Sequence, residues 1–128
     1  MPSSKDLSDY LAIALSAFNF VCIQAHLTPR FTPSFSKNLR TQLPHHNRVI
    51  FWWLGVPDTT LRYIFVSLNA FLGTLLAVPG WRSSGLKAAL GLLFVGFASD
   101  MKLKSGWLVH FLAHVALVGI TVSAIYVR

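Results

Sequence analysis

A carboxylate and three imidazoles lie inside long apolar segments of the chain, where ionisable side chains are rare. Asp100 is the acid within such a segment, and His26, His110 and His114 supply the imidazoles. An ionisable side chain at the centre of a bilayer costs about 2.5 to 3.5 kcal/mol, so each one needs a partner or a function. His110 and His114 are separated by one helical turn and therefore share a helix face. These positions predict one polar pocket to which the carboxylate and the imidazoles all contribute.

Proton transfer is the chemistry that suits such a pocket. A carboxylate and an imidazole can serve as base and acid on one substrate, so we expect Asp100 to act as a base or an anchor. His110 and His114 are then proton carriers or ligands, and His26 and Asn69 orient the substrate. Apolar walls around a polar base are typical of a site for a lipophilic molecule.

Two other uses of the same residues stay open. Asp100, His110 and His114 form a ligand set suited to non-haem iron, but the His-x-x-x-His spacing is too common to predict a metal, and we predict none. In the structural alternative, Asp100 only pairs with a nearby cation such as Lys102 or Arg62. The remaining polar groups would then satisfy one another between helices.

The composition is that of an integral membrane protein. Of the 128 residues, 54% are hydrophobic and 12% are charged, against roughly 25% charged in soluble chains, and the mean hydropathy is +0.57. The net charge of +7 comes from Lys and Arg residues between apolar segments, where anionic lipid headgroups account for them. We find no nucleic-acid-binding motif and expect no nucleic-acid partner. The partner we expect is the lipid bilayer.

Four apolar segments approach the length of about 20 residues that a spanning helix needs. The chain is therefore predicted to form one all-α transmembrane domain, residues 1–128, a four-helix bundle with spans at 10–27, 60–78, 85–101 and 107–127. The first span continues past Leu27 without a small-residue cleavage site, so we expect a retained helix rather than a signal peptide. Four spans place both termini on one side, and the distribution of Lys and Arg puts the loops in the cytoplasm.

The segment at 28–59, between the first two spans, is too polar to cross a membrane. It holds four prolines and four cations, and its apolar island at 49–56 contains Trp52 and Trp53. That island is too short to cross a bilayer at 1.5 Å per residue, which favours an interfacial or re-entrant segment. The simplest prediction is a surface loop anchored by the two tryptophans, and the alternative is a lid over the substrate.

Several sequence patterns carry a resemblance to a known family. They are Gly55-Val56-Pro57, Leu61-Arg62-Tyr63, the run from Asn69 to Pro79, the run from Gly85 to Gly91, and Ser99-Asp100-Met101-Lys102. In these patterns the chain resembles the DoxX-like small membrane proteins, especially their fungal branch. The resemblance implies a four-helix membrane bundle and a link to redox or quinone chemistry. Asn69 stands where we expect many members to have an acid.

The resemblance extends to a functional class. Small fungal membrane proteins of this kind are similar to enzymes that form or open epoxides on polyketide and terpenoid intermediates. We therefore expect a multi-pass enzyme of secondary-metabolite biosynthesis in the endoplasmic reticulum membrane, acting as an epoxidase on a lipophilic small molecule beside other pathway enzymes. An epoxide hydrolase or cyclase working by acid–base chemistry is one alternative, and a non-catalytic DoxX-like subunit or adaptor is another. The sequence names no cofactor.

Overall fold

The protein is described by a computed structural model that covers residues 3–102 and 107–128, without the side chains at positions 100 and 107–110. Within these ranges every regular element is a helix. The elements are α1 (Ser4–Leu27), α2 (Pro33–Val49), the short 3₁₀ helix η1 (Trp52–Leu54), α3 (Asp58–Ala77), the short 3₁₀ helix η2 (Pro79–Trp81), α4 (Arg82–Asp100) and α5 (Trp107–Tyr126). The predicted all-α class is confirmed for this part of the chain.

Capping groups, proline and glycine determine where the helices begin and end. Ser3 and Asp6 form a capping box at the start of α1: the Ser3 hydroxyl accepts from the Asp6 N–H (3.1 Å), and the Asp6 carboxylate accepts from the Ser3 N–H (2.9 Å). Pro33 occupies the first turn of α2, where a missing N–H costs no helical hydrogen bond. Gly55 adopts a left-handed conformation, with φ of 65°, between η1 and α3.

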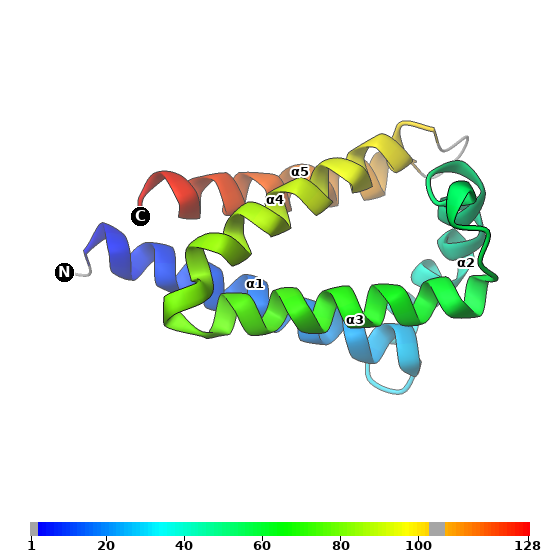
Figure 1. Ribbon diagram of the computed structural model, residues 1–128, viewed down its shortest axis with the longest axis horizontal. Helices are drawn as coiled ribbons and strands as arrows, with labels where there is room; N and C mark the ends of the chain where they lie inside the picture. The colour runs from blue at the N-terminus through cyan, green and yellow to red at the C-terminus, as the bar shows by residue number, and fades with distance from the viewer. Residues whose placement is uncertain (1–2, 103–106) are drawn as a thin grey trace.

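Four long helices run lengthwise, and α2 lies across one end of the molecule (Figure 1). Both termini lie at the opposite end. We call the two ends the α2 end and the terminal end. Helix α1 packs mainly on α3, α4 packs mainly on α5, and α2 contacts both α1 and α3. Because the long helices alternate in direction, the last turns of α1 and α4 lie at the α2 end, as do the first turns of α3 and α5 (Figure 1).

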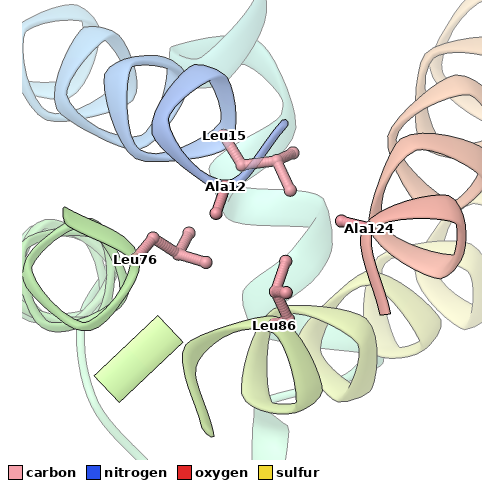
Figure 2. Packing of buried hydrophobic residues seen from close by; sticks show 5 residues of the cluster. All are labelled: Ala12, Leu15, Leu76, Leu86 and Ala124. Atoms are coloured by element: carbon pink, nitrogen blue, oxygen red, sulfur yellow. The ribbon is translucent and has the colours of Figure 1, made fainter. Parts of the chain in front are cut away.

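The main apolar core lies toward the terminal end. Figure 2 shows its side chains pointing toward one another from α1, α3, α4 and α5: Ala12, Leu15, Leu76, Leu86 and Ala124. Leu76 and Leu86 are fully buried, as are the two alanines. Small residues such as alanine allow helices to approach closely, so this end of the bundle is tightly packed.

An ionic cluster around Asp9 ties the terminal end together. The Asp9 carboxylate accepts a hydrogen bond from Arg128 (2.7 Å) and lies 3.3 Å from the Arg82 guanidinium. Arg82 also donates to the carbonyls of Leu76 (2.9 Å) and Ala77 (3.0 Å), which lie in the last turn of α3 and have no helical partner. Asp9 precedes the apolar segment of α1. The hydrogen bond from Arg128, together with Arg82, holds the pKa of Asp9 below its usual value.

The prediction of a surface loop at 28–59 is wrong for most of that segment. Residues 33–49 form α2, which presents one polar face outward and buries Ser36 and Leu43 on the other. Pro33 does not prevent this helix because it lies in the first turn. Trp52 and Trp53 follow in η1 and remain 70% and 65% exposed.

Two helices of the described chain, α1 and α3, are long and apolar enough to cross a membrane. The apolar described part of α5, Phe111–Tyr126, is shorter, and α4 carries Arg82 and Lys87. All four long helices begin and end within a few residues of the predicted spans, except that α1 begins six residues earlier, at Ser4 rather than 10. The four-span topology itself stays a prediction.

Candidate active site

Polar side chains from five helices lie toward the α2 end. Their presence there follows from the topology, because this end joins the C-terminal parts of α1 and α4 to the N-terminal parts of α3 and α5. The described members of this cluster are His26 (α1), His45 and His46 (α2), Arg62 (α3), Ser99 (α4) and His114 (α5).

His46 and Ser99 connect α2 to α4. His46 Nδ1 and the Ser99 hydroxyl share a hydrogen bond across 53 positions of sequence. Ser99 is 2% exposed and occupies the position directly before Asp100. This bond therefore fixes an imidazole of α2 next to the stretch of α4 in which the predicted carboxylate occurs.

His45 lies beside His46, with ring centroids 6.1 Å apart and the rings edge to face. Its Nε2 atom is buried and has no hydrogen-bond partner among the described atoms. A buried polar atom left without a partner costs about 1 to 3 kcal/mol. An atom of this kind is therefore a candidate for contact with a ligand or a water molecule.

His26 is buried between α1 and α3. It is 7% exposed, and its ring centroid lies 5.9 Å from that of Phe65, which in turn lies 5.4 Å from Phe51. The Arg62 guanidinium is close enough to His26 for the two charges to interact. The imidazole thus has aromatic rings on one side and a cation nearby.

His114 packs against α4. Its ring centroid is 6.0 Å from that of Phe97, and the Phe97 ring lies 5.3 Å from Phe111. The backbone of Gly96 approaches the same imidazole so closely that an added Cβ would lie 2.7 Å from His114 Nε2. Gly96 therefore makes room for the ring, and a side chain at this position would displace it.

The predicted site residues are only partly brought together. His26 and His114 both lie toward the α2 end, but they contact different aromatic residues, Phe65 and Phe97. Asn69 is half-buried and donates its Nδ2 hydrogen bond to its own helix, at the Phe65 carbonyl (2.8 Å).

The side chains of Asp100 and His110 lie outside the described residues. The predicted convergence of both on one cavity stays a prediction, and the alternatives of an iron site and of ion pairing by Asp100 stay open.

Sequence reasoning missed the contribution of α2. His45 and His46 are adjacent in the sequence, but a loop prediction for the surrounding segment gives them no position in the bundle. The helical periodicity of residues 33–49 is the signal that finds them, because it places a histidine on the face that α2 turns toward the bundle.

An open groove on the outer face of α3 lies apart from this cluster. It has a volume of about 470 Å³ and is lined by Thr60, Tyr63, Ile64, Ser67, Leu68 and Phe71. No predicted site residue lines it. Tyr63 and Phe71 are 51% and 60% exposed there, so the groove belongs to the outside of the bundle.

Comparison of the sequence with known proteins finds two close relatives. The chain is 70% identical to the cyclic ether formation enzyme gkaZ of Penicillium citrinum over 128 residues, which is 100% of both chains. It is 52% identical to the cyclic ether formation enzyme xenC of Xenoacremonium sinensis over 126 residues, which is 98% of this chain and 99% of that relative. No family model matches the chain, so the DoxX-like resemblance stays a prediction. No solved structure matches it either.

Proposed function

This chain belongs to the family of the cyclic ether formation enzymes, and from that premise we propose that it closes an ether ring within a lipophilic secondary metabolite. The support is the extent of the similarity, which covers the whole length of one relative and nearly the whole length of another. A biosynthetic role was predicted from the sequence, and the relatives carry names of that class.

The reaction we propose is intramolecular opening of an epoxide by a hydroxyl group of the same molecule. The hydroxyl oxygen attacks an epoxide carbon and gives its proton to a base, while the epoxide C–O bond breaks and an acid protonates the leaving oxygen. One C–O bond forms and another breaks. Substrate and product contain the same atoms, so the step consumes no oxidant.

The observation that carries this proposal is the packing of imidazoles against phenylalanine rings in the part of the bundle toward the α2 end. His26 packs on Phe65, and His114 packs on Phe97. Imidazole gives and accepts protons near neutral pH, and aromatic walls suit a lipophilic substrate. Ring closure by acid–base chemistry needs these two properties together.

Within the proposal, the predicted roles are retained. Asp100 is the base or anchor, and His110 and His114 carry protons. His26 and Asn69 orient the substrate.

We also propose that the protein lies in the lipid bilayer, as a multi-pass protein of the endoplasmic reticulum membrane. This location is supported by α1 and α3, which have the length and hydropathy of spanning helices. Large apolar side chains are also exposed along the outer faces of the long helices, among them Phe18, Phe20, Phe71, Phe94, Leu112 and Ile120. Tags at the two termini, tested for protease access in sealed microsomes, check the topology. Termini on opposite sides would contradict four spans.

The reaction is tested with membranes in which this protein is the only added component. Their substrate is the precursor purified from a producing strain in which the gene is deleted. We expect a product of unchanged mass, formed without oxygen and without label from isotopically labelled water. An additional oxygen atom from labelled O₂ would instead identify epoxidation, and an oxygen from labelled water would identify hydrolysis. Absence of any conversion would overturn the catalytic proposal in favour of a subunit or adaptor.

A further inference from the structure

Unsatisfied hydrogen-bonding capacity is concentrated at the α2 end. Over the described residues, four buried side-chain polar atoms have no hydrogen-bond partner: Gln24 Oε1, Ser36 Oγ, His45 Nε2 and Arg62 Nε. Gln24 lies in the last turn of α1, Ser36 and His45 lie on α2, and Arg62 lies near the start of α3. All four therefore belong to the three helix segments that meet at this end.

At the terminal end, the buried polar side chains that the structure describes have hydrogen-bond partners. Ser8 is as fully buried as Ser36, at 0% exposure, but its hydroxyl donates to the Ala124 carbonyl at 2.7 Å. Arg82, also buried, donates to Leu76 and pairs with Asp9. Since buried polar groups in folded proteins are normally paired, the α2 end is the exception among the described residues.

Loose attachment of α2 does not explain the unpaired atoms. The Gln24 side-chain amide donates to Thr32, the residue that precedes α2. At the other end of the helix, Asn47 donates to the Val56 carbonyl (2.9 Å) and to the Asp58 carboxylate (2.8 Å). The helix is thus tied to its neighbours near both of its ends, and the unpaired atoms lie between these ties or next to them.

We infer that α2 closes a polar subsite, formed with the adjoining ends of α1 and α3, that binds the hydrogen-bonding end of the lipophilic substrate. This inference rests on the proposed function, because it deepens the description of the same substrate. Arg62 Nε–H is only a donor and Gln24 Oε1 is only an acceptor. The group that satisfies both carries an acceptor oxygen and a donor N–H or O–H, as a carboxamide or a carboxylic acid does. His45 Nε2 and the Ser36 hydroxyl adapt to either.

The first test replaces His45 by a residue of similar shape that forms no hydrogen bond. In His45→Phe, we expect the precursor to bind about three- to tenfold more weakly, the scale of one lost neutral hydrogen bond. We also expect the ligand-free protein to melt at the same or a higher temperature, because the variant removes a buried polar atom that has no protein partner. Equilibrium dialysis and thermal unfolding of the detergent-solubilised full-length protein provide the two measurements. Unchanged affinity would overturn the subsite.

Two buried serines provide a matched comparison that needs no aromatic replacement. Ser36→Ala removes an unpaired hydroxyl, so we expect weaker binding with unchanged or raised stability. Ser8→Ala removes a hydroxyl that is hydrogen-bonded to α5, so we expect lower stability with unchanged binding. If His45→Phe does not accumulate, the two serine variants alone test the inference. Equal affinity of Ser36→Ala and Ser8→Ala for the precursor would contradict it.

Binding and turnover separate this inference from the proposed function. If the precursor binds in a His45-dependent manner but is not converted, ring closure is wrong and the subsite stands. If the precursor is converted and the affinity of His45→Phe and Ser36→Ala equals that of the parent protein, the subsite is wrong and ring closure stands.

Discussion

Substitution of Gly96 by alanine tests whether the position of the His114 imidazole matters for catalysis. A Cβ at position 96 would lie 2.7 Å from His114 Nε2, whereas ordinary contact begins at 3.4 Å. The ring must therefore move by about 0.7 Å to restore ordinary contact with the methyl group. Because misplacement of a reacting group by about 1 Å costs on the order of a hundredfold in rate, we expect turnover to fall roughly ten- to a hundredfold.

The same substitution is expected to leave folding nearly intact. The contact that the methyl group creates is with the far end of a side chain, which can rotate away, and alanine favours a helix over glycine by about 1 kcal/mol. Gly91→Ala is the matched control, because it lies on the same helix and an added Cβ there meets nothing within 4 Å. We expect Gly91→Ala to keep full turnover. The assay is ring-closed product per unit of folded, detergent-extracted protein.

A double variant shows whether the loss acts through His114. In a His114→Ala background the added methyl group has no ring to displace, so Gly96→Ala should cost little more. Full turnover by Gly96→Ala in the parent background would refute a catalytic role for His114. An equal additional loss in the His114→Ala background would show that the methyl group disturbs something else.

Three further substitutions give distinct outcomes. Asp100→Asn keeps the shape of the side chain but removes its charge, and if Asp100 is the base we expect normal accumulation with about a hundredfold less product per molecule; normal turnover would exclude that role. Asp9→Asn removes the charge that Arg128 and Arg82 stabilise. Since the pKa of Asp9 is lowered in the folded state, its contribution to stability is present at neutral pH and lost as the pH falls through that pKa, so melting curves of variant and parent should differ at neutral pH and converge in acid. Leu76→Ala empties part of the fully buried core and should lower the free energy of unfolding by about 2 to 5 kcal/mol, measured by denaturant titration in detergent.

The long helices are the part of the fold that the sequence predicts well. Apolar segments of spanning length are easy to recognise. Pro79 and Gly80 mark the break between the end of α3 and the start of α4. Helix α2 is not recognised in this way because it is polar and amphipathic and has Pro44 inside it. In a chain dominated by apolar segments, the four prolines and four cations of the segment at 28–59 resemble those of a loop.

The candidate site is less predictable because its contacts connect distant residues. Nothing in the local pattern joins His46 to Ser99, since that bond depends on how α2 lies across the end of the bundle. Asn69 shows the same limit for a local contact. The sequence places this amide within an apolar helix but does not reveal that its Nδ2 donates to the carbonyl one turn earlier, a local bond that short polar side chains often form; its orienting role stays a prediction.

The two ends of the bundle differ in packing, and this difference affects how easily each end opens. Segments held by dense apolar contacts and paired polar groups open rarely, whereas segments with fewer such contacts open at lower free energy. The core around Ala12 and Leu76 and the Asp9 cluster hold the four long helices together at the terminal end. The opposite ends of these helices can therefore separate without breaking these contacts. Amide hydrogens of α2 should therefore exchange with solvent faster than those around Leu76. Opening at the α2 end would then let a lipophilic ligand enter and leave while the terminal end stays folded.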